Sequence, residues 1–171
     1  METKSNLVAA FTGHRKERIL QGCGNNFQIL GQIRDAVVNQ VIELYGQGYN
    51  VFYTGMANGF DMIAAEAVLL VKERYGDITL AAAIPFRKQS LWFDAEDRLS
   101  YHRLLKKADR VVMVSENYYK GCYIRRDEYM VSKADTVIAY WDLERKGGTF
   151  YTVNKAIESK KQVINVYEKM K

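Results

Sequence analysis

The residues with the clearest chemical potential lie in a glycine-containing stretch, residues 54–61, which reads Thr-Gly-Met-Ala-Asn-Gly-Phe-Asp. Residues 50–54 are rich in β-forming side chains, whereas residues 61–75 carry apolar side chains at helical spacing. The first turn of a helix has unpaired N–H groups and a partial positive charge. A strand–loop–helix junction of this kind therefore suits a phosphate or another anion.

Three residues of this loop have individual roles in the prediction. Gly55 is expected to take the left-handed conformation that the turn needs, and Gly59 is expected to let a ligand approach the backbone. Asp61 stands where the N-cap of the following helix belongs, and there it could accept a hydrogen bond from a ribose hydroxyl. A plain turn with Asp61 as a mere cap explains the same pattern, so the loop alone does not decide between the two.

A second candidate group follows the first apolar run, residues 7–11, and consists of Gly13, His14 and Arg15. A glycine, an imidazole and a guanidinium at the carboxyl end of a buried strand could grip a ligand, because open α/β sheets bind ligands at that edge. A histidine in a loop can equally be an ordinary surface residue.

Two further candidates lie nearer the C-terminus. Arg126 is expected in the first turn of a helix, where a cation opposes the helix dipole unless an anion or a carboxylate lies nearby. Asp127 could supply that carboxylate on a solvated face. Gly147, Gly148 and Thr149 open another helix and form a second candidate anion site.

Aromatic and cationic side chains also occur together, as binding of single-stranded nucleic acid requires. One group is Tyr118, Tyr119 and Tyr123 with Lys120, Arg125 and Arg126. Trp92 lies in a polar loop after the only proline and could stack on a base, although a tryptophan there more often packs a loop onto the core.

The elements that must position these residues follow from the apolar pattern. Strands are expected at 7–11, 50–54, 78–84, 110–114, 136–140 and 163–166. Helices are expected at about 27–45, 61–75 and 94–107. Two further helices are expected to end at residue 134 and at about residue 159, and residues 17–26 are expected to form a polar connection. This alternation predicts an α/β protein, a Rossmann-like three-layer α/β/α sandwich with a mainly parallel sheet of about six strands. All the candidate groups then follow carboxyl ends of strands.

Composition limits the class of protein. A chain of 171 residues with 48% hydrophobic residues suits one compact domain. The net charge of +5 permits, but does not require, attraction to a nucleotide or a nucleic acid. Two cysteines without CxxC spacing and two histidines favour neither a zinc site nor a disulfide framework, so no metal is expected. The first apolar run is too short for a signal sequence or a membrane span, which predicts a cytoplasmic protein without a membrane partner.

On these motifs the chain resembles the SLOG superfamily of Rossmann-like proteins, as a single SLOG-type domain over residues 1–171. Residues 54–61 resemble the Ser-Gly-Met-Ala-Arg-Gly-Ile-Asp loop of the Smf/DprA (DNA-processing protein A) family. The nearer resemblance is to the YspA/YoqJ-like family of unknown function. It rests on Thr12-Gly13-His14-Arg15, Pro85-Phe86 with Gln89 and Trp92, Ala108-Asp109, Arg126 with Tyr129-Met130-Val131, and Gly147-Gly148-Thr149.

The resemblance implies binding of a nucleotide or a nucleotide-derived ligand. The chain departs from the patterns of its relatives at two places. Asp127 stands where the YspA/YoqJ-like pattern usually has asparagine, which exchanges an amide for an acceptor-only carboxylate. After Gly147 and Gly148 the chain lacks the catalytic glutamate of the LOG branch, so the phosphoribohydrolase activity of that branch is not expected. Members of the superfamily often pair, which makes a homodimer a further expectation.

Three hypotheses on function follow. The first is binding of a small nucleotide-like ligand at the carboxyl edge of the sheet, with no resident cofactor, in which Arg15 and Arg126 add charge-assisted bonds. The second is an N-glycosidic hydrolase or transferase, with Asp61, Glu66 and His14 as candidate catalytic residues. Positions five apart on a helix differ by about 140°, so Asp61 and Glu66 face one ligand only if Asp61 is off the helix. The third is single-stranded DNA binding, as in some relatives, and whether the protein is an enzyme stays open.

Overall fold

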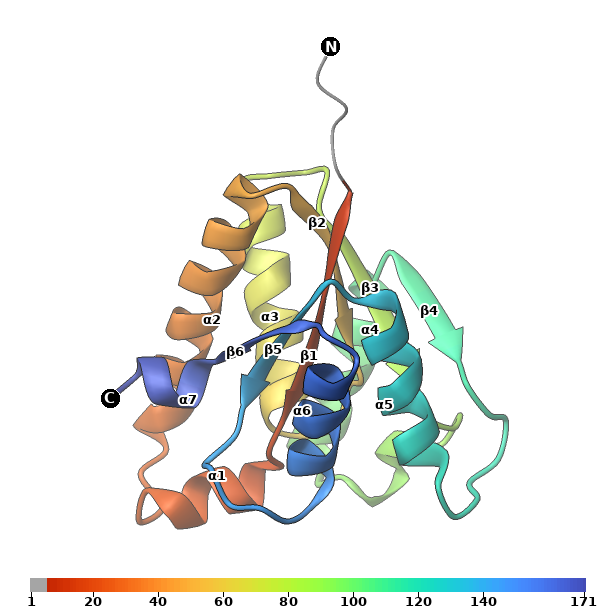
Figure 1. The fold of residues 1–171 in the computed structure, drawn as a ribbon. Helices are drawn as coiled ribbons and strands as arrows, with labels where there is room; N and C mark the ends of the chain where they lie inside the picture. Colours follow the sequence, from red (N-terminus) through yellow and green to blue (C-terminus); the bar gives the residue numbers. More distant parts are fainter. Residues whose placement is uncertain (1–5) are drawn as a thin grey trace.

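A computed structural model of the protein, shown in Figure 1, describes residues 6–171. Its sheet is parallel throughout and has the strand order β4-β3-β2-β1-β5-β6. The strands are β1 (Leu7–Gly13), β2 (Tyr49–Thr54), β3 (Thr79–Ile84), β4 (Arg110–Met113), β5 (Thr136–Tyr140) and β6 (Gln162–Asn165). The predicted α/β, Rossmann-like architecture is confirmed for the part of the chain that the structure covers. A single domain over residues 1–171 stays a prediction, because residues 1–5 lie outside the described part.

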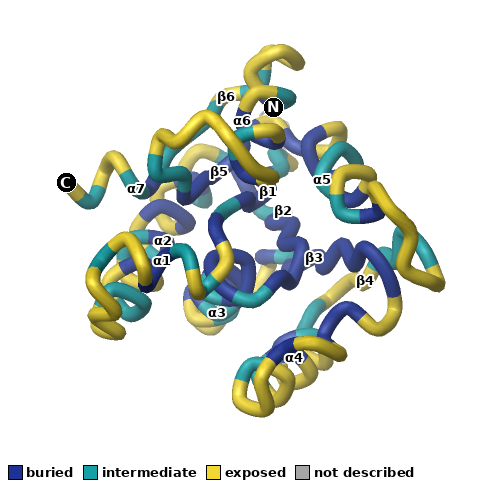
Figure 2. Tube along the Cα trace, turned by 90° about the horizontal axis from the view of Figure 1, so that it is seen from below, coloured by how far each residue is buried: buried dark blue, intermediate teal, exposed yellow. Residues whose placement is uncertain are grey.

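Helices cover both faces of the sheet, as Figure 2 shows from the end at which the strands finish. One face carries α1 (Lys16–Gly22), α2 (Gln28–Gly46), α3 (Phe60–Lys72), α4 (Ala95–Lys107) and the short α7 (Val166–Lys169). The other face carries α5 (Cys122–Lys133) and α6 (Gly148–Glu158). A single 3₁₀ turn, η1 (Gln89–Trp92), precedes α4. Among residues 6–171, no helix is long and apolar enough to cross a membrane.

The two cores follow from the alternation of side chains along each strand. The larger core, under α2 and α3, contains Phe11, Phe52 and Leu80. The smaller core, under α5 and α6, receives the intervening residues Ala10, Tyr53 and Ala81. Because both faces of the sheet are buried, its strands read in the sequence as continuous apolar runs.

The chain changes direction across the sheet at β1. It adds β2, β3 and β4 on one side of β1 and then returns to place β5 on the other side. Gly13 and Tyr140 pair at the carboxyl ends of β1 and β5. From there the chain continues into α1 on one face and α6 on the other. Such a switch point leaves a crevice at the strand ends, where doubly wound folds bind their ligands.

One expected connection is a helix instead. Residues 17–26 were predicted to be a polar loop, but α1 occupies Lys16–Gly22. Ile19 and Leu20 are its buried residues, and Ile19 belongs to the larger core. The correction matters because α1 places a further charged side chain beside the switch point.

Candidate functional site

A cavity of about 240 Å³ lies at the carboxyl ends of β1 and β2, between those strand ends and the starts of α5 and α6. We call it the edge cavity. Most of the residues that line it are of polar type: Thr12, Gly13, His14, Arg15, Arg18, Ala57, Asp61, Tyr123, Ile124, Arg126, Asp127, Lys146, Gly148 and Thr149. The fold thus brings together candidates from four separate parts of the sequence. Gly55, Gly59, Gly147 and Glu66 are predicted site residues that do not line it.

Asp61 faces the edge cavity from the first turn of α3. The N-cap of α3 is Gly59, so the prediction of Asp61 as the cap is wrong. The Asp61 side chain is 6% exposed, and its Oδ2 atom accepts a hydrogen bond from the Ala57 N–H at 3.3 Å. Its Oδ1 atom is buried without a partner among the described residues. Burial raises the pKa of Asp61 to about 6, although Arg126 and Arg15 act to lower it.

Gly55 and Gly59 serve the protein's own packing. Gly55 is absent from the residues with positive φ, which include Met56 at 60°, so the predicted left-handed Gly55 is wrong. A Cβ atom on Gly55 would lie 2.5 Å from Nη1 of Arg126. Gly59 has φ 117°, and a Cβ atom there would lie 2.5 Å from the backbone nitrogen of Lys16. The space expected for a ligand beside these glycines is therefore filled by protein atoms.

Three N–H groups at the turn after β2 also have protein acceptors. Met56 N–H donates to the Thr54 hydroxyl at 3.3 Å, and Ala57 N–H donates to Asp61. Phe60 N–H donates to the carbonyl of His14 at 3.1 Å. An anion at this loop would have to displace these bonds. The Gly55–Gly59 loop is therefore a poorer anion site than the sequence pattern indicates.

The start of α6 has more of the features that favour an anion. Gly147 is its N-cap, with φ 94°, and has no side chain with which to cap the helix. Gly148 and Thr149, the first two residues of α6, line the edge cavity. The first N–H groups of a helix lack acceptors within the helix and carry its positive dipole end. They lie beside a cavity that Lys146 also lines.

Arg126 is a buried side chain that connects the loop after β2, directly, and α6, through Asp127. It is 3% exposed, and its Nη1 atom donates to the Gly55 carbonyl at 2.6 Å. Its Nε atom donates to Asp127 at 2.6 Å, and Asp127 accepts a further bond from the Thr152 hydroxyl of α6 at 3.2 Å. Since α5 begins at Cys122, Arg126 lies in the second turn, and the predicted first-turn position is wrong. Burial acts to lower the pKa of Arg126, but Asp127 and Asp61 outweigh it, so the guanidinium stays charged.

His14 belongs to a charged cluster that the sequence did not reveal. Its Nε2 atom lies 3.1 Å from both the backbone nitrogen and Oδ1 of Asp142. Arg18 donates two bonds to the same carboxylate, at 3.0 and 2.8 Å. Burial lowers the pKa of His14, against the opposing effect of Asp142. Burial acts to raise the pKa of Asp142, but the bonds from Arg18 and from the Glu144 N–H outweigh it and hold that pKa at about 2.

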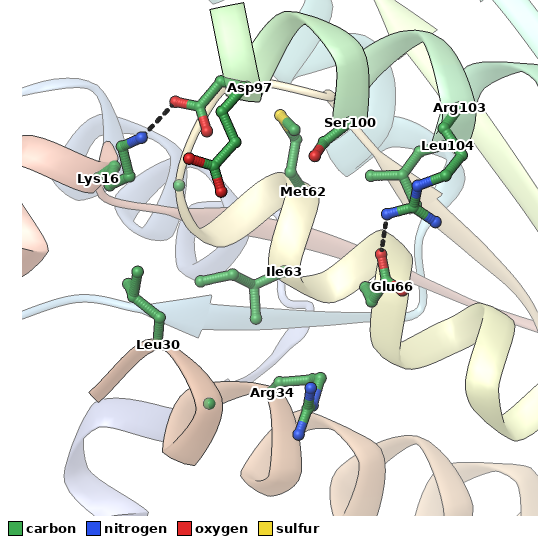
Figure 3. Close-up of a pocket in the computed structure, with 13 residues that line it drawn as sticks. Lys16, Leu30, Arg34, Met62, Ile63, Glu66, Asp97, Ser100, Arg103 and Leu104 are labelled. Atoms are coloured by element: carbon green, nitrogen blue, oxygen red, sulfur yellow. Dashed lines mark hydrogen bonds and ion pairs between the residues drawn. The ribbon is translucent and has the colours of Figure 1, made fainter. Parts of the chain in front are cut away.

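Glu66 lies in a different cleft, shown in Figure 3. This cleft of about 390 Å³ lies between α2, α3 and α4. Glu66 accepts a bond from Arg103 at 2.7 Å there, and Lys16 pairs with Asp97 across the same cleft. Asp61 and Glu66 thus point to separate cavities, as helical geometry requires when both residues are part of one helix. Of the three candidate catalytic residues, Asp61 and His14 line the edge cavity and Glu66 does not.

Within residues 6–171, no group of three or more His, Cys, Asp or Glu side chains is placed to hold a metal ion. The groups that converge on the edge cavity are cations, a helix start and two carboxylates. Cations and helix N–H groups bind anions, and a carboxylate accepts hydrogen bonds from hydroxyls. The chemistry of the cavity is therefore that of a site for an anion that also carries hydroxyl groups.

The parallel sheet and its crevice at the β1–β5 switch point define the class as Rossmann-like α/β proteins. More specifically, the chain belongs to the YspA SLOG family, whose model matches residues 9–169. The chain is 27% identical over 157 residues to the UPF0398 protein BH1768 of Halalkalibacterium halodurans, which covers 91% of this chain and 82% of the relative. The SLOG resemblance is thereby confirmed.

Two solved structures have the same fold. DNA processing protein A (DprA) from Streptococcus pneumoniae aligns with a TM-score of 0.61 and 18% identity over 92% of this chain. The chain spans 49% of that protein's length. DNA processing protein A from Helicobacter pylori, whose structure is described for its single-stranded DNA binding mode, aligns with a TM-score of 0.61 and 17% identity. That alignment covers 96% of this chain and 71% of the other.

Proposed function

We propose that the edge cavity binds a nucleotide or a nucleotide-derived ligand. One observation carries this proposal: a single cavity combines the uncapped start of α6 with four cationic side chains. These are Arg15, Arg18, Arg126 and Lys146. Phosphate oxygens are the acceptors that such donors bind best, through charge-assisted hydrogen bonds. Each such bond contributes about 1.5–3 kcal/mol, so three or four support micromolar affinity after the cost of association.

Asp61 supports the sugar part of the proposal. Its Oδ1 atom is a buried acceptor without a partner in residues 6–171, and the residue lines the same cavity. A buried oxygen of this kind loses free energy unless it is hydrogen-bonded, so a ligand hydroxyl that reaches it is stabilised. A ribose carries such hydroxyls next to its phosphate. The cavity therefore suits a sugar phosphate better than an inorganic anion alone.

Replacement of Arg15 by alanine tests the proposal. Arg15 is exposed, and its guanidinium lies 5.2 Å from the centre of the Tyr123 ring. Arg74 is a matched control, because it is also exposed and lies 5.5 Å from the centre of the Tyr75 ring, away from the edge cavity. Arg126 is less suitable, since its loss would also break the bond to Gly55.

We expect Arg15→Ala to weaken binding of the preferred nucleotide by about tenfold or more, which corresponds to one charged hydrogen bond. Arg74→Ala should leave the affinity unchanged. Titration calorimetry against nucleoside mono-, di- and triphosphates, dinucleotides and ADP-ribose measures both. The proposal fails if the unmodified protein binds none of these compounds, or if the two variants bind with equal affinity.

Turnover of the bound ligand is a separate question that the same site raises. Asp61, with a pKa of about 6, and His14 are the titratable candidates for N-glycosidic cleavage in the edge cavity. Release of free base from a bound nucleotide, followed by chromatography, identifies a hydrolase. Retention of intact nucleotide over many hours identifies a binding protein.

A second candidate function, binding of single-stranded nucleic acid, has one observation in its favour. Trp92 is 72% exposed and Tyr118 is 56% exposed, with Phe86 between them in ring contact with both. Trp92 was expected to pack onto the core, so this exposure is a correction to that expectation. Lys120 and Arg125 follow Tyr118 closely in the sequence, and exposed aromatic and cationic side chains together have the composition of a surface on which bases stack.

A further inference from the structure

A second cavity, of about 420 Å³, adjoins the edge cavity. His14 and Arg18 line both cavities, and the two have no other lining residue in common. The second cavity is formed by α1, the start of α2, the end of β5 and α7. We call it the tyrosine cavity. The His14–Arg18–Asp142 cluster is therefore a boundary between two adjacent spaces at the β1–β5 switch point.

The two cavities differ in chemistry. The edge cavity offers the start of α6 together with four cationic side chains. The tyrosine cavity is also partly charged, through Asp142, Glu144 and Lys171, but it adds the aromatic and aliphatic side chains of Tyr140, Tyr167, Ile19 and Ile29. The rings of Tyr140 and Tyr167 meet edge to face, with 5.5 Å between their centres. Aliphatic and aromatic side chains of this kind bind a planar ring by stacking and by burial of its faces. One space thus suits a phosphate and the other suits a base.

The volumes favour a ligand that uses both spaces. Small-molecule sites in proteins usually have volumes of roughly 300–1,000 Å³. The edge cavity, at about 240 Å³, lies below that range, whereas the two cavities together lie within it. A complete nucleotide is therefore accommodated better by the pair than by the edge cavity alone.

Another location for the base is the ring of Tyr123, which lines the edge cavity directly. That ring already has two cationic neighbours, the guanidinium of Arg15 at 5.2 Å and that of Arg126 at 5.7 Å from its centre. A base that stacked there would have to displace Arg15, which lies over the ring. In the tyrosine cavity, the amino group of Lys171 lies 4.3 Å from the centre of the Tyr167 ring. A base that stacked there would displace this exposed lysine, whereas at Tyr123 it would displace Arg15, a cation of the phosphate site.

Resting on the proposed function, we infer that the ligand is a nucleoside 5′-phosphate that spans both cavities. Its phosphate lies against the start of α6, and its base lies in the tyrosine cavity between α1, α2 and α7. Its sugar lies at the boundary formed by His14 and Arg18. Tyr140, Tyr167 and Ile29 are then the residues that select the base.

The test places a bulky side chain at the tyrosine cavity. Gly22 ends α1 and lines this cavity, and a Cβ atom there would meet no heavy atom within 4 Å. Gly22→Phe therefore adds a ring at the cavity from an open position. Gly46 ends α2, has equally open space and lines neither cavity, so Gly46→Phe is the matched control. Tyr167→Ala, which removes a wall of the cavity, is the second variant, and thermal unfolding shows that each variant is folded.

The probes are the four ribonucleoside 5′-monophosphates and ribose 5-phosphate, measured by titration calorimetry. We expect Gly22→Phe and Tyr167→Ala to weaken the best-binding nucleotide by about tenfold, the lower end of what a stacked base contributes. Affinity for ribose 5-phosphate, which has no base, should be unchanged in both. Gly46→Phe should match the unmodified protein with every probe.

The outcomes separate the two proposals. If the unmodified protein binds neither nucleotides nor ribose 5-phosphate, the proposed function fails and the inference fails with it. If nucleotides bind but neither variant weakens them, the proposed function stands and the tyrosine cavity does not hold the base. Equal weakening of nucleotides and ribose 5-phosphate also overturns the inference, because the variants then act on the phosphate end.

Discussion

Burial and neighbouring charge act on the pKa of Asp61 in opposite directions. Burial raises the pKa of this carboxyl from 3.8 to about 6, while Arg126 acts to lower it. An acid with a higher pKa in the folded state binds more protons when folded than when unfolded between the two values. Stability therefore falls as the pH rises from about 4 to about 6.

Asp61→Asn removes this dependence, because an amide has no proton to lose in that range. As the pH rises from ~4 to ~7, the unmodified protein should lose up to about 3 kcal/mol of unfolding free energy relative to the variant. Urea denaturation of both proteins at the two pH values measures it. A difference that is the same at both values would show that Asp61 titrates normally in the folded protein.

Residue types alone identified part of the site. Arg15, His14 and Asp61 were predicted from their positions after apolar runs, and the structure brings them to one cavity. Arg18 and Asp142 were not predicted as site residues, although they meet in a two-bond contact. They are 124 positions apart in the chain, and no local pattern reports a contact at that separation.

Among the elements, the junction of β1 and α3 has the tightest geometry. Arg15 and Gly59 form an isolated bridge, and Lys16 N–H donates to the Asn58 carbonyl at 3.3 Å. This contact holds the loops after β1 and β2 together beside the edge cavity. It requires a glycine, because residue 59 has φ 117° and no room for a Cβ atom.

We expect Gly59→Ala to destabilise the protein by about 1–3 kcal/mol or more, from backbone strain and from the clash with Lys16. Gly46→Ala is the control, since Gly46 lies in a helix with open space around it, and it should be neutral or stabilise by about 0.5–1 kcal/mol. Urea denaturation measures both variants. Equal stability of the two would contradict a tight junction at Gly59.

The helix α1 was not predicted because it lacks the sequence features that usually mark a helix start. The N-cap position of α1 is Arg15, which makes no side-chain cap, so the usual start signal is missing. Its residues are mostly polar, and two of them are buried. By contrast, α2 has five buried residues over about five turns, and its bounds were predicted within one residue at each end.

At the scale of the whole molecule, the net charge of +5 bears on the nucleic-acid candidate. If single strands bind to the exposed aromatic surface, affinity for an oligothymidine should fall steeply as salt rises, because Lys and Arg release counterions from the phosphates. Trp92→Ala should weaken this binding by about tenfold, through loss of one stacked base. Fluorescence anisotropy at two salt concentrations measures both effects. Absence of affinity at low salt would remove this candidate.

A homodimer and a cytoplasmic location also belong to this scale, and both stay predictions. Light scattering after size exclusion measures the first. Fractionation of cells that express the protein measures the second.

The sequence by itself determined the class of fold, because the apolar runs and helical stripes are local patterns set by burial on both faces of a parallel sheet. It also placed the candidate residues after strand ends, which in a parallel sheet meet at one edge. Only the tertiary structure decided how these residues are used. It assigned Gly55 and Gly59 to packing, Arg126 to an interior bond, and Glu66 to another cleft. The physical reason is that burial, strain and pairing between distant segments depend on which side chains meet, and that is settled when the helices pack onto the sheet.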